Sequence, residues 1–416
     1  MHFVAIAPNQ LGGQWMNRQH LMWAVKDHAP VLYAQEPEAW YSGRKPRDER
    51  FFRAGLEPKA ETLSVLRLPK CLCRRGRQGA WNATVDRWKA SLIRRAAKAS
   101  DGPRILYFWH PELYPYVELL RPDLAIYHVF DRIPEYHEPQ FAGRPLYNAF
   151  RSACRAADVV VAGTAEQAAI VPNRQAEVVP NGVAYDWYDR VLAEPDDVAR
   201  IPRPRIGYAG SISKKLDFAW FESLASRSRF HLVLVGPLGN LGAEEAEDWI
   251  RLCSLSNVHY LGPKPAAILP AYVKAFDVGL VNYRRGIHSE AASPLKLYEY
   301  AAAGLPIIAS RMHSLAGDAS LADLLRFVDS PDEAASAVEQ ALRNECDGPN
   351  IERRKAFARA NSWQQRAQRV VDLALSKLGQ SADIALPSAA SARVAAAGSK
   401  SSPNVPFIKP AETRSA

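Results

Sequence analysis

The 416-residue sequence lacks any apolar run of about eighteen residues, the length that a helix needs to cross a membrane. Its five cysteines are odd in number and scattered, with no CxxC pair and no nearby histidines at zinc-site spacing, so we expect reduced thiols. The first ten residues, MHFVAIAPNQ, lack the basic start and the small-residue cleavage site of a signal peptide. We therefore expect a cytoplasmic protein.

Motifs for common cofactors and metals are also missing. No GxGxxG fingerprint follows the first expected strand, and there is no GxxxxGK[ST] loop, no HExxH and no Asp-x-Asp pair that could hold a nucleotide-bound metal. Dehydrogenase, P-loop ATPase and metalloprotease functions thereby lose their support, and we expect neither a cofactor nor a metal. The composition, 48% hydrophobic and 23% charged residues, is typical of a soluble globular protein, and the chain is long enough for two domains.

The net charge is +9, and the positive excess is concentrated in residues 44–100. This segment has 16 lysines and arginines against 5 acidic residues, with Trp81, Trp88, Leu92 and Ile93 between them, which suits an anionic surface. Because the chain shows no helix-turn-helix, zinc-finger or RNA-recognition signature, we favour an anionic membrane surface and expect no nucleic acid partner. A solvated basic face with no partner is the alternative.

Short apolar, β-branched runs alternate with helix-period segments, the pattern of parallel sheets with helices on both faces. The expected strands are 2–8, 30–35, 104–109, 125–131, 158–164 and 176–183 in the first half, then 205–211, 231–237, 257–262, 278–283, 306–310 and 324–329. The pattern restarts after a charged, proline-containing segment at 186–203. The sequence thus predicts an α/β fold of two Rossmann-like doubly wound domains that face a cleft.

We place the amino-terminal domain at 1–185, with a basic insertion at about 44–100, and the carboxyl-terminal domain at 204–360. A last helix at 361–378 is expected to pack across the two domains. Residues 380–416 are rich in Ala, Ser and Pro and poor in large apolar side chains, so we expect a disordered tail.

The stretch SPLKLYEYAAAGLPIIAS, residues 293–310, predicts a short helix followed by a strand. Ser293 is a good N-cap and Pro294 suits the first helical position, whereas Gly304 suits the C-terminal cap and Pro306 prevents continuation. Both ends of the helix are therefore expected from local signals.

In this register Lys296 lies in the first turn, where the helix dipole disfavours a cation, and Glu299 lies one turn further on. A phosphate would offset that penalty, because it can bind the free N–H groups, the Ser293 hydroxyl and the Lys296 ammonium together. Glu299 would then reach sugar hydroxyls of the same ligand. The pattern predicts a site for a nucleoside diphosphate, and a solvated Lys/Glu pair is the alternative.

Other second-half loops offer further ligands beside this helix. The GSISKK loop supplies Gly210, Ser211, Lys214 and Lys215, and Tyr283 could pack its ring on a base or sugar. The YLGPKP turn at 260–265 could contact a base edge with its backbone. These residues come from different strand ends, and their coincidence favours the diphosphate site over the solvated pair.

Candidates in the first half also follow expected strands. Gly12 and Gly13 allow close backbone approach, although two glycines after a strand can mean only a tight turn, and Arg18 lies on the next helix. His110, before a proline, could orient an acceptor hydroxyl or be incidental. Asp131 ends an apolar strand and could be a general base, or else a helix cap or a partner for the next residue, an arginine.

These motifs, with ADVVVAGT, VVPNGV, YAGSISKKLD and NVHYLGPKPAAILPAYVKAFDVGLVNY in that order, resemble bacterial GT-B glycosyltransferases. The similarity is greatest to the teichuronic-acid-biosynthesis type and more distant to the xanthan glucuronosyltransferase, and it is most specific from about 205 to 310. The resemblance implies that Lys296 binds the donor diphosphate, that Glu299 binds its ribose and that Asp131 is the base of an inverting reaction. It also implies that the carboxyl-terminal domain binds the donor and the amino-terminal domain the acceptor.

One position departs from the retaining relatives, which carry two glutamates eight positions apart. The position eight before Glu299 is Ala291, with Glu290 one residue away. The roles of Glu290 and His288 and the stereochemical outcome therefore stay open, and we favour inversion. We expect a metal-independent enzyme that transfers a sugar from a nucleotide-sugar, UDP-linked, to a lipid-linked or polysaccharide acceptor in exopolysaccharide, capsule or cell-surface glycan synthesis. It would work at the inner face of the cell membrane, held there by the basic segment. A sugar-nucleotide epimerase and a non-catalytic sugar-nucleotide or membrane-binding protein are the alternatives.

Overall fold

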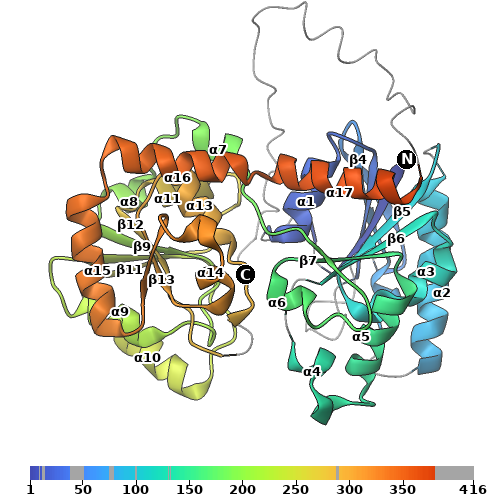
Figure 1. Ribbon diagram of the computed structural model, residues 1–416, viewed down its shortest axis with the longest axis horizontal. Helices are drawn as coiled ribbons and strands as arrows, with labels where there is room; N and C mark the ends of the chain where they lie inside the picture. Colours follow the sequence, from blue (N-terminus) through green and yellow to red (C-terminus); the bar gives the residue numbers. More distant parts are fainter. Residues whose placement is uncertain are drawn as a thin grey trace, which may run out of the picture.

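The computed structural model describes residues 1–8, 10–11, 15–37, 51–74, 79–98, 101–129, 131, 133–286 and 290–379. Several sites of prediction, namely Gly12, Gly13, His288 and the segment 380–416, lie outside the described residues. The chain forms two α/β bodies, each with a central sheet between helices (Figure 1). The predicted α/β fold with two doubly wound, mainly parallel sheets is confirmed.

The first half forms an eight-stranded sheet in the order β3-β4-β2-β1-β5-β6-β7-β8, in which only β3 and β4 pair antiparallel. Its strands are β1 (His2–Ala7), β2 (Val31–Gln35), β3 (Gly55–Ala60), β4 (Leu63–Arg67), β5 (Arg104–Phe108), β6 (Leu124–Val129), β7 (Val159–Ala162) and β8 (Glu177–Val178). The β3–β4 hairpin was not expected, because GLEPKA contains a glycine and a proline that weaken a strand pattern. Part of the basic segment therefore extends the sheet.

Helices cover both faces of this first sheet. One face is covered by α1 (Asn17–Val25) and by the last helix, α17 (Trp363–Lys377), which contribute Leu21 and Val370 to a common core. The other face is covered by α2 (Gly79–Ala97), α3 (Pro115–Leu120) and α5 (Pro145–Ala156). The sheet is therefore buried on both sides, as its continuous apolar strands require.

The second half forms a six-stranded parallel sheet in the order β11-β10-β9-β12-β13-β14. Its strands are β9 (Arg205–Ala209), β10 (His231–Val235), β11 (Val258–Gly262), β12 (Val278–Val281), β13 (Ile307–Ser310) and β14 (Leu325–Val328). Its larger helices are α9 (Phe218–Ala225), α10 (Ala243–Cys253), α11 (Leu269–Lys274), α13 (Leu295–Ala303), α15 (Pro331–Asn344) and α16 (Gly348–Ala360). All six expected strands of this half are present.

Short helices complete the connections in both halves. They are α4 (Pro134–His137), α6 (Ala165–Ala168), α7 (Tyr185–Asp189), α8 (Asp196–Ala199) and α14 (His313–Ala316), with 3-10 turns at Lys70–Leu72, Pro111–Leu113, Pro139–Phe141 and Ala319–Leu321. Among the described residues no helix is both long and apolar enough to cross a membrane. All five cysteines are free.

The chain passes between the two halves twice, and the two passages lie side by side. Val183 on the first passage pairs with Ser362 on the second, with Val183 N–H donating to Asn361 O at 3.1 Å and Trp363 N–H donating to Val183 O at 3.0 Å. After α16 the chain thus returns to the first half, where α17 lies beside α1 (Figure 1).

Candidate active site

The predicted helix at residues 293–310 is α13, and it begins one residue later than expected. Pro294, not Ser293, occupies the N-cap and offers no side-chain acceptor, whereas the Ser293 hydroxyl lies 3.4 Å from the backbone N of Asn181. The Ser293 N-cap prediction is therefore wrong, because a residue from outside the carboxyl-terminal domain takes up that hydroxyl. The C-terminal prediction is confirmed: Gly304 adopts a left-handed conformation with φ 78°.

Lys296 is a buried cation near the start of α13, with 7% of its surface exposed. Its Nζ donates to the Tyr283 hydroxyl at 2.7 Å and lies 4.9 Å and 4.7 Å from the ring centres of Tyr208 and Tyr283. Burial lowers the pKa of Lys296, but charge interactions with Tyr208, Tyr283 and Tyr300 raise it more, and the net shift is upward. Because phenols carry charge only near pH 10 and above, these interactions do not balance the Lys296 charge at neutral pH, where the rings are neutral. No described carboxylate forms an ion pair with Lys296. An anionic ligand would supply that missing charge.

The ends of β9 and β10 approach each other closely beside this lysine. A Cβ on Gly236 would lie 2.0 Å from Gly210 O, so only glycine fits there, and φ of Gly210 is 154°. A Cβ on Gly210 would lie 3.2 Å from Lys296 Cε. Of the GSISKK loop, the structure thus brings the Gly210 backbone to the lysine, while Ser211 and Lys215 are exposed.

Glu299 lies one turn further along α13. Burial raises the pKa of its carboxyl to about 7, an effect that the nearby Lys296 ammonium only partly offsets. Within the described part of the chain its carboxylate has no hydrogen-bond or ion-pair partner. A partly buried carboxylate of this kind can accept hydrogen bonds from hydroxyl groups of a ligand.

Glu290, the residue left open by the sequence, contacts another helix. Its Oε2 accepts a hydrogen bond of 2.7 Å from the backbone N–H of His313, the first residue of α14. Ala291 is completely buried, and its carbonyl accepts a hydrogen bond of 2.9 Å from Gln167 of the first half. The side chain of Glu290 is thus engaged in capping α14 in this structure.

The structure brings two residues that were expected to face the acceptor, Arg18 and Asp131, into one electrostatic environment. Arg18, on α1, is 5% exposed; burial lowers its pKa, and the charges of Tyr33 and Asp131 oppose that shift. Asp131 follows β6 and is partly buried. Its expected alternative partner, the arginine at 132, lies outside the described residues.

His110 follows β5 and caps the 3-10 turn at Pro111–Leu113. Its Nδ1 accepts a hydrogen bond of 3.3 Å from Glu112 N–H, which leaves Nε2 to carry the proton of the neutral ring. Burial lowers the pKa of His110; Glu112 opposes this shift, while Arg74 and Arg18 add to it. A neutral His110 with a free Nε2–H can donate a hydrogen bond to an acceptor group.

Sequence reasoning missed a buried network made from part of the basic segment. Arg74 forms two hydrogen bonds with the Asp86 carboxylate, at 3.1 Å and 2.5 Å, and Tyr116 donates to the same carboxylate at 3.1 Å. Lys89 is fully buried, with its Nζ 2.5 Å from Glu36 Oε2. These cations bind internal carboxylates, so the expectation that the whole segment faces an anionic surface is too broad. The sequence signal that could have shown this is helical spacing: Lys89 lies four residues after Val85 and four before Ile93, on the apolar face of α2.

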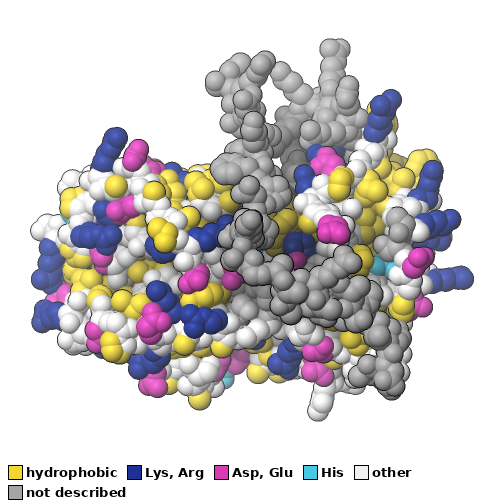
Figure 2. Space-filling model, turned by 90° about the horizontal axis from the view of Figure 1, so that it is seen from above, with side chains coloured by type: hydrophobic (Ala, Val, Ile, Leu, Met, Phe, Trp, Pro, Cys, Tyr) yellow, Lys and Arg dark blue, Asp and Glu magenta, His cyan; other side chains and the backbone are white. Residues whose placement is uncertain are grey.

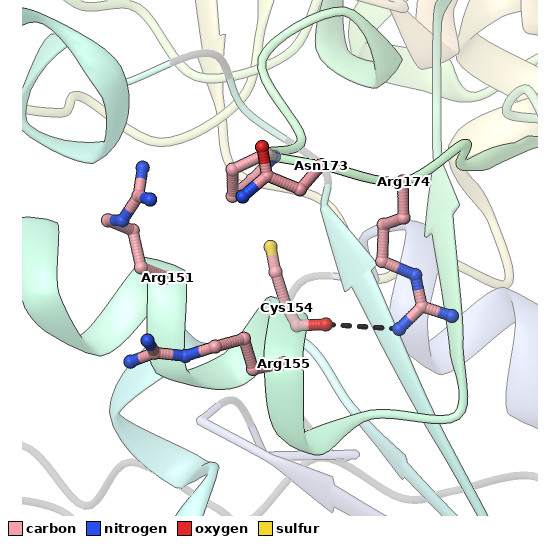
Figure 3. A pocket seen from close by; sticks show the side chains of 6 residues that line it. Arg151, Cys154, Arg155, Asn173 and Arg174 are labelled. Atoms are coloured by element: carbon pink, nitrogen blue, oxygen red, sulfur yellow. Dashed lines mark hydrogen bonds between the residues drawn. The ribbon is translucent and has the colours of Figure 1, made fainter.

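One cavity of about 430 Å³ lies away from these residues (Figure 3). It is lined by Arg151, Cys154, Arg155, Pro172, Asn173 and Arg174. Arg174 donates to the carbonyls of Cys154 and Ala157 at the carboxyl end of α5, next to the first residues of β7. The carboxyl ends of the strands lie on the opposite edge of the sheet, so this cavity is separate from the candidate site.

Comparison with known proteins supports the fold and gives a family match within the second half. Residues 203–344 match the family described as "Glycosyl transferases group 1". A protein of Bacillus subtilis named as a teichuronic acid biosynthesis glycosyltransferase, TuaH, is 29% identical over 190 residues, 44% of this chain and 47% of that protein. The matched region thus spans about half the length of this curated relative.

Solved structures resemble the chain over most of its length. The E. coli trehalose-6-phosphate protein bound with UDP-2-fluoro glucose has a TM-score of 0.65 at 14% identity, with 92% of this chain and 99% of that chain covered. Anabaena HepE in complex with UDP and glucose has a TM-score of 0.63 at 16% identity, with 90% of this chain and 99% of that chain covered. Sucrose-phosphate synthase of Thermosynechococcus elongatus has a TM-score of 0.66 at 15% identity, with 91% of this chain and 100% of that chain covered. At these identities the similarity establishes the GT-B fold.

Proposed function

We propose that this protein transfers a sugar from a nucleotide-sugar donor to a lipid-linked or polysaccharide acceptor, because residues 203–344 match the group 1 glycosyl transferases and the chain has a GT-B fold. The observation that carries the proposal is the buried Lys296 ammonium near the start of α13, with no described carboxylate as partner. The relatives in complex with UDP or a UDP-sugar support a UDP-linked donor.

In this mechanism the donor diphosphate lies at the start of α13, where free backbone N–H groups and Lys296 balance its charge. The Glu299 carboxylate accepts hydrogen bonds from the ribose hydroxyls. As the glycosidic bond to the diphosphate breaks, the added negative charge on the leaving nucleoside diphosphate is stabilised by the same groups. No metal is required in this scheme, because the helix and Lys296 supply the positive charge.

On the acceptor side, Asp131 removes the proton from the attacking hydroxyl, and His110 Nε2–H orients it. The Arg18 cation interacts with the charge of Asp131 and balances part of it. We propose that the sugar is transferred with inversion, since Ala291 occupies the position of the first glutamate in the retaining relatives and Glu290 caps α14.

For the acceptor, we propose that α2 holds the protein at an anionic membrane surface during cell-surface glycan synthesis. Trp88 is 66% exposed, and Arg87, Arg94 and Arg95 are exposed with it. Figure 2 shows Lys and Arg side chains along the right-hand edge of the molecule, the side on which α2 lies in Figure 1. An exposed tryptophan among cations suits the interface of an anionic bilayer.

The donor site is tested by calorimetric titration with UDP and then GDP. We expect wild type to bind UDP and Lys296→Ala to bind it at least tenfold more weakly, since the diphosphate loses a buried cation. Lys377→Ala removes an equal charge from the exposed end of α17 and should bind as wild type does. Failure of the wild-type protein to bind either nucleotide would overturn the donor assignment.

Catalysis is tested at Asp131, with transfer of sugar from UDP-sugars to membrane-extracted acceptor measured in EDTA. We expect Asp131→Asn to bind UDP with unchanged affinity and to transfer at least 100-fold more slowly, because the amide cannot accept the hydroxyl proton. Undiminished transfer by Asp131→Asn would remove it from the mechanism. Loss of wild-type transfer in EDTA would overturn metal independence.

A further inference from the structure

One of the residues through which the first half of the molecule contacts the loop that precedes α13 is a buried glutamine. Gln167, on α6 after β7, is completely buried. Its Oε1 accepts a hydrogen bond of 2.9 Å from Gly163 N–H, and its Nε2 donates to Ala291 O at 2.9 Å. The Thr164 hydroxyl lies 3.3 Å from the same carbonyl. The Ala291 carbonyl thus receives two donors from the other half.

The next residues before α13 are held in the same way. Asn181, on the first passage between the halves, donates from Nδ2 to Ser293 O at 2.6 Å, and its backbone N lies 3.4 Å from Ser293 Oγ. The Pro294 N-cap has no side-chain acceptor of its own. Contacts from outside the carboxyl-terminal domain therefore fix the backbone that leads into the helix carrying Lys296 and Glu299.

We propose that Gln167 is a positioning residue that couples the contact between the two halves to donor binding at α13. This inference rests on the proposed function for the identity of the ligand. When the Gln167 bond to Ala291 is made, the first turn of α13 and the Lys296 side chain are held ready for a diphosphate. By thermodynamic linkage, a diphosphate bound at α13 must in turn favour the Gln167 contact by the same factor.

The side chain at 167 allows the two bonds to be separated. Gln167→Glu keeps an oxygen for the Gly163 N–H but replaces the donor to Ala291 with a second oxygen, so it breaks the bond between the halves selectively. Gln364→Glu introduces the same charge on the exposed face of α17 and is the matched control. If Gln167→Glu does not fold, Gln167→Met replaces it as the test variant, because methionine is uncharged, of similar length and has no N–H to donate to Ala291 O.

The experiment combines calorimetric titration with UDP and amide hydrogen exchange on the full chain, with and without UDP. We expect Gln167→Glu to bind UDP about tenfold more weakly, with faster exchange at residues 290–297. In wild type and Gln364→Glu, UDP should slow exchange at residues 163–168. In Gln167→Glu that protection across the domain contact should be lost, which a purely structural role of Gln167 would not produce.

The results separate this inference from the proposed function. Wild-type affinity and exchange in Gln167→Glu would overturn the coupling while leaving the donor site intact. If wild type binds neither UDP nor GDP, the donor assignment fails, and exchange at residues 290–297 alone decides the positioning role. Faster exchange in Gln167→Glu would then show only that Gln167 orders this loop, so the coupling would fail with the donor assignment, and unchanged exchange would overturn the positioning role as well.

Discussion

Two buried lysines in this protein have opposite surroundings. Lys89, in the first half, is fully buried, and its Nζ lies 2.5 Å from the Glu36 carboxylate. Lys296, in the second half, is 7% exposed and lies between two tyrosine rings, where it donates a hydrogen bond to the Tyr283 hydroxyl. The two lysines are thus buried to a similar degree, but among the described residues only Lys89 forms an ion pair with a carboxylate.

Under the proposed function, this difference separates a cation that stabilises the fold from one that binds a ligand. A buried ion pair has its charge balanced in the folded chain, so removal of either member leaves the other uncompensated. A buried cation beside neutral rings gains only about 0.5–2 kcal/mol from each ring, less than the several kcal/mol that desolvation costs. Lys296 is therefore expected to contribute affinity for an anion and little to stability.

The largest expected effect is at Lys89. Lys89→Met leaves the partly buried Glu36 carboxylate without its partner, and we expect a loss of about 3–5 kcal/mol in the free energy of unfolding. Lys296→Met removes a cation with no carboxylate partner and should leave that free energy unchanged or higher. Urea unfolding of both variants, followed by circular dichroism, measures the two values.

The control for this comparison is the double variant Lys89→Met/Glu36→Gln, in which neither charge remains. It should recover much of the stability lost by Lys89→Met, because an uncharged pair has a smaller desolvation cost. Equal destabilisation by Lys89→Met and Lys296→Met would show that the two lysines have the same role, and the distinction drawn between them would fail.

The fold and helix α13 could be predicted from the sequence because their signals are local. Apolar runs predicted the strands, and Gly304 predicted the end of α13, since a left-handed C-cap depends on one residue. The start of α13 was misplaced by one residue, because Ser293 is drawn to Asn181, which lies far away in the chain. Lys296 and Glu299 were brought near each other by their spacing within one helix.

The remaining features depend on contacts between distant segments. Nothing in the residues around Lys89 indicates that Glu36 is its partner, and nothing around Gln167 indicates the carbonyl of Ala291. Such contacts are set by how the sheets and helices pack, and one sequence does not encode that in its local pattern. The sequence accordingly counted Lys89 among surface cations, where the structure buries it.

A smaller effect is expected at Glu299, which shares α13 with Lys296. Burial raises the pKa of its carboxyl from the usual 4.5 to about 7, so the folded chain holds this proton more tightly than the unfolded chain does. The resulting stabilisation is complete below pH 4.5 and is lost as the pH rises through about 7. Its upper limit, from the difference between these two values, is roughly 3 kcal/mol.

Glu299→Gln cannot titrate, so its free energy of unfolding should fall less than that of wild type between pH 5 and pH 8, as measured by urea unfolding at each pH. Saturating UDP should narrow this difference, because ribose hydroxyls that donate to the carboxylate favour its charged form and compensate for its burial. Identical pH dependence in wild type and Glu299→Gln would mean that the Glu299 carboxyl keeps an ordinary pKa. Lys296 would then be the one residue on α13 whose charge burial destabilises, and the comparison of Lys89 with Lys296 would be unaffected.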